Sequence, residues 1–350
     1  MNYLEMKKPY WKRMDYQVVD EIKQKEFDLA NIHMQNTVQE GLSITNTPEL
    51  SRPEPYRGLG EYFEAENMQR INNKMHIKIT KNISEMVVIK YVLDSVNDTL
   101  INGIEIDMEE NTSAKILIYY ESADDSFGYH NGYLRVNAKK NSNLELINLQ
   151  NLNGNSKNFT QTDFLNYDDS VVEYYDLELG AKINAVAAKS RLIGDRANML
   201  FLPAYLVDEH KKADYEYSLL FHGKSGIGNI EGRGATKDYG YKVFRGNIYF
   251  YKGCSKSKAS EGEFSILLDD TITIHAIPAM LCDEDDVLGA HAASVGKVDE
   301  DRLFYLMSRG FNAKEAKKII VESAFRPIFE KIEIEDIKEK MFIELNKRML

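Results

Sequence analysis

The residue of this chain best suited to chemistry is His291, which stands among small side chains in the segment Gly289-Ala-His-Ala-Ala-Ser294. An imidazole changes charge near neutral pH and is a common metal ligand. Small neighbours would let an ion or another chain approach closely. A histidine that is hydrogen-bonded within a turn is the alternative interpretation. The residue alone therefore indicates either a metal ligand at a surface or a turn histidine.

The two cysteines form no local chelating motif. Cys254 and Cys282 stand 282 − 254 = 28 residues apart, and no Cys-x-x-Cys is present. Any metal site that uses these thiols would therefore require ligands assembled by folding or dimerisation. We expect Cys254 to be structural, with metal binding as its alternative role. Cys282 precedes the acidic run 283–286, which would raise its thiol pKa and argues against a nucleophile.

The sequence contains no complete motif for nucleotide binding or hydrolysis. Gly223-Lys224-Ser225 resembles the end of a phosphate-binding loop, but Ser218 stands where the first glycine belongs. Gly226-Ile-Gly228 is followed by Gly232 one residue too late for a dinucleotide fingerprint. We therefore expect that the chain is not an enzyme and binds no nucleotide itself, so that a partner would have to supply any nucleotide dependence.

Composition narrows the class of protein. The 350 residues are 43% hydrophobic and 28% charged, with a formal net charge of −11. Such acidity disfavours nucleic acid and anionic membranes as partners, because binding to phosphates depends on clustered Lys and Arg. The sequence has neither an apolar run of about 18 residues nor the pattern of a signal peptide. We expect a cytoplasmic protein.

From about residue 85 to residue 296 the sequence predicts many short strands. Apolar runs at 86–93, 115–120, 144–149, 171–179, 215–221 and 247–251 are separated by Asn, Asp and Gly. The lack of helical segments between them excludes a doubly wound α/β fold and leaves a sandwich, a barrel or a β-helix. Only Pro203 and Pro278 fall in this region, which suits stacked rungs because proline removes a ladder hydrogen bond.

Helical patterns flank the β region. Within residues 1–84 we expect a small helical segment and a linker, because Trp11, Met14, Val18, Ile22 and Leu29 recur at mostly helical intervals and 36–60 is rich in Asn, Thr, Pro and Gly. In residues 297–350, Asp299 can begin a helix that Gly310 ends, and Asn312 with Glu315 resembles a capping box. These C-terminal helices either pack back on the β core or present a docking surface.

Four elements in order resemble the C-terminal signature of the SufB/SufD family of iron–sulfur cluster assembly scaffolds. They are His275-Ala-Ile-Pro278, Asp283-Glu-Asp-Asp286, Ala290-His-Ala-Ala-Ser294 and Leu303-Phe-Tyr-Leu-Met-Ser-Arg-Gly310. The resemblance is strong over about residues 240–330 and absent from the first eighty or so. It implies a mainly β fold with a parallel β-helix core over 85–296, a small N-terminal helical segment within 1–84, and a C-terminal helical subdomain over 297–350.

The resemblance also implies partners. The C-terminal helices would dock a SufC-like ABC-type ATPase, and the last strands would pair with a SufB-like subunit or a second copy of this chain. A transient iron–sulfur cluster would form at that subunit interface. The docking residues would be Leu303, Phe304, Tyr305, Met307, Ser308, Arg309, Ile319 and Ile320.

The ligand-type residues favour the SufD-like branch of that family. Where the SufB branch has a cysteine before a Ser-x-Leu strand this chain has Glu263, and where that branch has a glutamate after the histidine it has Ala292. His291 is thus the principal candidate ligand, with Glu263 and Cys254 as lesser ones. Two other functions stay open, a carbohydrate-active β-helix enzyme (a polysaccharide lyase or hydrolase), which would need paired carboxylates, and a metal-free oligomeric structural protein.

Overall fold

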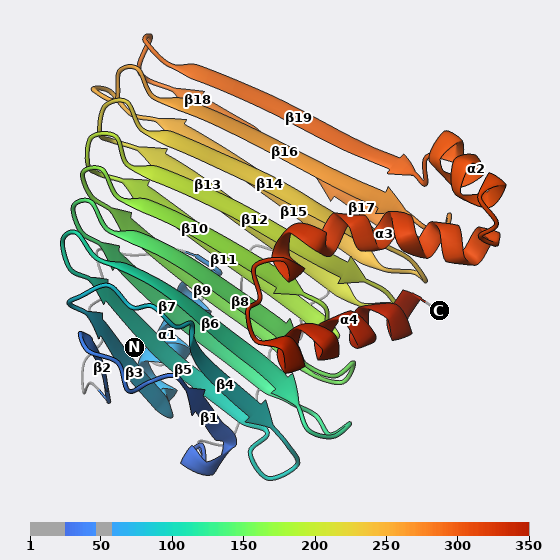
Figure 1. Ribbon diagram of the computed structural model, residues 1–350, viewed down its shortest axis with the longest axis horizontal. Coiled ribbons are helices and arrows are strands. Elements are labelled where there is room, and N and C mark those ends of the chain that lie inside the picture. The colour runs from blue at the N-terminus through green and yellow to red at the C-terminus, as the bar shows by residue number, and fades with distance from the viewer. Residues whose placement is uncertain (1–24, 47–57, 350) are drawn as a thin grey trace.

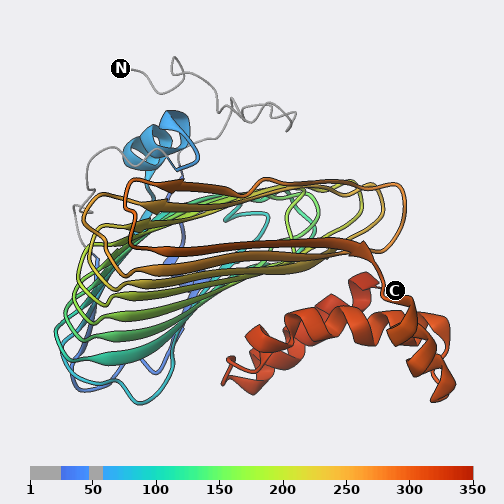
Figure 2. The ribbon, with the colours of Figure 1, turned by 90° about the horizontal axis from the view of Figure 1, so that it is seen from above.

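The computed structural model describes residues 25–46 and 58–349. In it, two β-sheets face each other along the length of a solenoid (Figures 1 and 2). The first sheet contains, in order of pairing, β1 (Ile32–Gln35), β4 (Val87–Leu93), β6 (Ser113–Ser122), β8 (Asn143–Asn151), β10 (Val171–Glu178), β12 (Asn198–Val207), β14 (Ile227–Thr236), β16 (Lys258–Leu267) and β19 (Leu288–Lys297). The second contains β2 (Leu42–Thr45), β3 (Asn73–Ile79), β5 (Thr99–Met108), β7 (Tyr129–Ala138), β9 (Lys157–Asn166), β11 (Ile183–Leu192), β13 (Lys212–Phe221), β15 (Tyr241–Phe250) and β17 (Thr273–Ala276), with β18 (Ala279–Cys282) also beside β15. From β3 onward the chain alternates between parallel sheets, which confirms the predicted β-helix.

One corner of the solenoid repeats a residue in the left-handed conformation in six successive coils. The backbone amide of Asn111 donates to the carbonyl of Lys140 at 3.0 Å, and that of Asn141 donates to Asp168 at 2.9 Å, which ties each coil to the next. Asn and Asp tolerate positive φ better than most residues, which explains why they supply many of the turns. The φ angles of these corner residues are 54° to 64° at Asn111, Asn141, Asp169, Arg196, Ser225 and Lys256.

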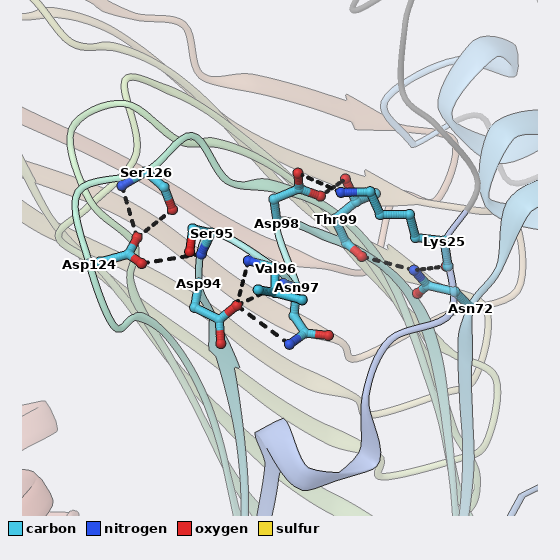
Figure 3. A network of polar contacts seen from close by, with 10 residues as sticks. All are labelled: Lys25, Asn72, Asp94, Ser95, Val96, Asn97, Asp98, Thr99, Asp124 and Ser126. Carbon is cyan, nitrogen blue, oxygen red and sulfur yellow. Dashed lines mark hydrogen bonds and ion pairs between the residues drawn. The ribbon is translucent and has the colours of Figure 1, made fainter.

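Aspartates fix other corners, as the loop between β4 and β5 shows (Figure 3). Oδ1 of Asp94 accepts hydrogen bonds from the backbone amides of Val96 and Asn97 at 2.8 and 2.7 Å. Oδ2 of Asp124, one coil further on, accepts from the amide of Ser95 at 3.2 Å. The hydrogen bond from Asn97 lowers the pKa of Asp94, so the ionised carboxylate is the form that holds the corner.

A row of buried polar side chains interrupts the apolar interior. Nδ1 of His130 lies 2.6 Å from Oδ1 of Asn158, and its Nε2 lies 3.0 Å from Oδ1 of Asn102. The amide of Asn158 donates to Asn184 at 2.8 Å, and Asn184 donates to Glu178 at 2.6 Å. Burial lowers the pKa of His130 to about 4. The ring is therefore neutral inside the folded protein, and the row continues from coil to coil.

The sheets extend to the N-terminal side of residue 85, where we expected the β core to begin. Strand β3 already pairs with β5, because Met75, Ile77 and Ile79 alternate inward. In the described part of the predicted helical segment the structure has the 3-10 turn η2 (Leu29–Asn31), then β1 and β2, and later the helix α1 (Glu61–Arg70). The predicted positions Trp11, Met14, Val18 and Ile22 lie outside the described residues. Phe63 of α1 stacks on Phe159 with ring centroids 4.3 Å apart, so this helix covers the second sheet.

The C-terminal helices are α2 (Glu300–Ser308), α3 (Ala313–Phe329) and α4 (Glu335–Met349), on the opposite side of the solenoid from α1 (Figure 2). Asp299 caps α2, Asn312 and Glu315 form the predicted capping box, and Gly310 has a φ of 102°. Helices α3 and α4 cover the outer face of the first sheet with Val321, Phe325, Ile328, Ile337, Met341 and Leu345. In the described ranges no helix has the length and apolar character to cross a membrane.

Candidate functional site

The C-terminal end of the solenoid presents a long open strand edge. Strand β19 pairs with β16 on one side, and no strand of the described residues pairs with it on the other (Figure 1). The N-terminal end differs, because the short strands β1 and β2 close onto β4 and β3 in antiparallel fashion. An edge of this length exposes a row of unpaired N–H and C=O groups, which favours pairing with another chain.

His291 lies in the middle of this edge strand and faces Glu261 on β16. The two residues are paired in register, and Nδ1 of His291 lies 3.5 Å from Oε2 of Glu261. The histidine side chain is 37% exposed, whereas that of Glu261 is 2% exposed. His291 is therefore an exposed residue at the open end of the solenoid, with one side toward a buried acid and another toward solvent.

Glu261 is the residue of this site that we did not predict. It lies on the same face of β16 as Ala259, which belongs to the interior core, so its side chain points between the sheets. Burial raises the pKa of Glu261, His291 opposes that shift and the charge of Glu263 adds to it. The spacing Glu261-Gly-Glu263 in a predicted strand places both acids on one face, and this signal could have identified Glu261.

Glu263 has partners within the chain. It forms an ion pair with Lys242 of β15, and the hydroxyl of Tyr205 donates to the same oxygen, Oε1, at 2.5 Å. Both charged side chains are almost fully buried, and the desolvation of Lys242 lowers its pKa. The charge of Glu263 thus already has a buried counter-ion within the chain. Its role as a metal ligand stays a prediction.

The cysteines do not complete the site as a recognisable metal centre. Cys254 lies in the interior core and burial raises its thiol pKa, while Cys282 is exposed on β18. Across residues 25–46 and 58–349, no group of three or more His, Cys, Asp or Glu side chains is arranged to hold a metal ion. The structure therefore brings together His291 and Glu261, with Glu263 beside them.

The predicted docking residues of α2 lie on the surface. Phe304 is 74% exposed, Tyr305 and Met307 are also exposed, and no residue of this helix is buried. The guanidinium of Arg309 lies 5.2 Å from the ring centroid of Tyr305, which is within the range of a cation–π contact. The hydroxyl of Ser308 donates to the carbonyl of Tyr305 at 2.7 Å. Helix α2 thus shows an apolar face that the described part of the chain does not cover.

Helix α3 divides the remaining predicted residues. Ile319 is half-buried and, with Phe329 and Phe342, lines a groove of about 460 Å³ between α3 and α4. Ile320 is 8% exposed and faces inward, so a partner could not contact it freely. The C-terminal helices were expected either to pack on the β core or to present a docking surface. Helices α3 and α4 pack on the core, whereas α2 and the groove at Ile319 remain available to a partner.

Comparison with known proteins shows the family to which this chain belongs. Residues 91–324 match the model described as "SUF system FeS cluster assembly, SufBD core domain". The chain belongs to the SufBD family. The matched region runs from β4 into α3, and therefore includes the edge strand, His291 and α2.

Named SufBD relatives are distant and longer. The chain is 32% identical to the iron–sulfur cluster assembly protein SufD of Bacillus subtilis over 136 residues, 39% of this chain and 31% of the relative. It is 25% identical to a SufBD family protein of Staphylococcus saprophyticus over 206 residues, 59% and 44% of the two chains. With SufD of Escherichia coli it shares 22% over 245 residues, 70% and 58%. The chain therefore spans about one third to three fifths of the length of these relatives.

Proposed function

We propose that this SufD-like component of the SUF system is a non-catalytic scaffold that recruits an ABC-type ATPase and pairs with a SufB-like subunit or a second copy of itself. The observation that carries the proposal is the direct connection between α2 and β19. The edge strand ends at Lys297 and α2 begins at Glu300. A partner that moves α2 would therefore act directly on the strand that holds His291.

The ATPase-docking part of the proposal rests on α2 and on the groove between α3 and α4. Phe304 and Met307 are exposed on a helix that buries none of its residues, and Ile319 of α3 lines the groove. Exposed aromatic and Met side chains next to a groove are typical of interaction surfaces. This chain has no phosphate-binding loop of its own, so a docked ATPase would supply the nucleotide chemistry.

The pairing part of the proposal rests on β19. A second β-helix that adds a strand to this edge would satisfy its unpaired backbone groups. His291 would then lie at the junction of the two subunits, where a nascent iron–sulfur cluster is built or transferred. ATP-driven association of the recruited ATPase subunits would pull on α2 and reshape this junction. The partner supplies the thiolates that the site of this chain lacks.

Co-purification tests the docking assignment. We expect tagged full-length chain to retain the SufC-like ATPase, and the variants Phe304→Asp and Met307→Asp to lose it while they keep the wild-type melting temperature. Val96→Asp is the matched control, because Val96 is 73% exposed but lies at the corner between β4 and β5. Retention of the ATPase by both α2 variants would show that the docking surface lies elsewhere.

Iron and sulfide analysis of the anaerobically purified complex separates this proposal from a metal-free structural role. We expect both elements in the complex with its partner subunit. Membership of the SufBD family gives no support to the alternative of a carbohydrate-active enzyme.

A further inference from the structure

A carboxylate oxygen without a hydrogen-bond partner is buried at the open end of the solenoid. Glu261 is 3% exposed, and its Oε2 accepts no hydrogen bond from the described part of the chain. A buried carboxylate is strongly disfavoured unless a cation or hydrogen-bond donors compensate it. The group that faces this oxygen is the imidazole of His291, with Nδ1 3.5 Å away.

The neighbouring acid, Glu263, differs from Glu261 because its carboxylate has partners within the chain. Glu263 lies two residues further along β16 on the same face, but Lys242 and Tyr205 both contact its Oε1. The ion pair with Lys242 offsets the charge of Glu263 inside the chain. Glu261 has no such lysine partner among the described ion pairs, and it points toward the exposed His291.

Gly246 on the opposite sheet makes room for this carboxylate. A Cβ built at Gly246 would lie 2.4 Å from Cγ and 2.6 Å from Oε1 of Glu261. Any side chain at position 246 would therefore displace the acid. A glycine in the interior of a strand weakens the strand and often marks a close approach, and here the group that approaches closely is the carboxylate of Glu261.

We propose that Glu261 and His291 together form a half-site for ferrous iron, which this chain contributes to the assembly interface. The inference rests on the proposed function and names the cargo held by this half of the interface. Carboxylate oxygen and imidazole nitrogen suit Fe²⁺, whereas a sulfide anion would be repelled by the negative charge of an ionised Glu261. Water or the paired subunit completes the coordination on the exposed side of His291.

Anaerobic titration of the full-length chain with Fe²⁺, followed by calorimetry, tests the half-site. We expect saturable binding by the wild type and a dissociation constant raised about tenfold or more, or about 1.4 kcal/mol, in both Glu261→Gln and His291→Ala. Glu231→Gln is the matched control, because Glu231 lies on the adjacent strand β14 with its side chain 41% exposed. No saturable binding by the wild type, or wild-type affinity in Glu261→Gln, would overturn the proposal.

A second variant moves the carboxylate without removing it. Gly246→Ala keeps both proposed ligands but displaces Glu261, so Fe²⁺ binding should weaken while Glu231→Gln binds normally. Thermal unfolding of each variant shows whether it is folded. If Glu261→Gln lowers the melting temperature but binds Fe²⁺ like the wild type, the Glu261–His291 pair is only a structural contact and the proposal is wrong.

The outcome can be separated from that of the proposed function. Glu261→Gln should still co-purify with the SufC-like ATPase, because the substitution lies inside the solenoid and away from α2. Loss of Fe²⁺ affinity with retained ATPase supports the half-site. Unchanged Fe²⁺ affinity in a chain that still recruits the ATPase and forms a His291-dependent cluster overturns the half-site and leaves the scaffold function standing.

Discussion

Lys242 and Glu263 form an ion pair sealed inside the solenoid, on facing strands of the two sheets. Two residues away on β16, Glu261 faces a histidine that is open to solvent. One acid is thus neutralised by its own chain, and the other faces a histidine on the edge strand, which a second chain can approach. The end of the solenoid therefore holds one acid whose charge is compensated by a lysine and one whose charge is not.

Lys242→Met should destabilise the protein strongly. Removal of the lysine leaves the charge of Glu263 buried and unpaired, and such a loss typically costs about 3 to 5 kcal/mol. The free energy of unfolding in urea measures the effect. The double variant Lys242→Met/Glu263→Gln should recover most of the loss, and an equal loss in both variants would show that the charge of Glu263 is not the cause.

Replacement of a phenylalanine by alanine should change the free energy of unfolding much more on α3 than on α2. Phe325 is fully buried between α3 and the first sheet, so Phe325→Ala should cost about 3 to 5 kcal/mol of unfolding free energy. Phe304→Ala on α2 should change that free energy by less than about 0.5 kcal/mol. Urea unfolding checks both variants. A large loss at Phe304 would mean that α2 is part of the folded core, contrary to the docking proposal.

His130 should make the fold acid-sensitive. Its pKa is about 4 in the folded protein, against an ordinary value of 6.5, so below pH 6.5 the unfolded chain binds the proton more readily. Stability from this group is therefore present above pH 6.5 and is lost as the pH falls toward 4. Between pH 7 and pH 5 we expect a loss of about 2 kcal/mol.

The control for this effect is His130→Gln, which cannot titrate in that range. Its unfolding free energy at pH 7 and at pH 5 should differ by about 2 kcal/mol less than that of the wild type. The same pH dependence in the two proteins would show that other groups cause the acid sensitivity.

The sequence predicted the parts of this fold that depend on local patterns. Alternating apolar runs and turns rich in Asn and Asp indicate strands and corners, and Asp299 and Asn312 mark helix starts, because each signal acts within a few residues. The polar row around His130 was not predicted, since Asn102 and Asn158 reach it from separate coils.

At the candidate site, His291 was recognised from its segment, but its pairing with Glu261 depends on strand register. Thirty residues separate the two positions, and no local signal brings them together. Ile320 was assigned to the docking surface because the family resemblance implies that the C-terminal helices dock a partner. The resemblance does not tell which side of α3 the sheet covers, and the structure turns Ile320 inward.

The most direct test of the scaffold function compares wild type and His291→Ala in the complex with the SufC-like ATPase and partner subunit, reconstituted anaerobically. Iron and acid-labile sulfide per complex are the measured quantities, with the melting temperature recorded in parallel. We predict that His291→Ala keeps its ATPase and its melting temperature but loses most of the cluster. Wild-type iron and sulfide in the variant, or a loss of cluster matched by a loss of stability, would contradict a role for His291 at a shared assembly site.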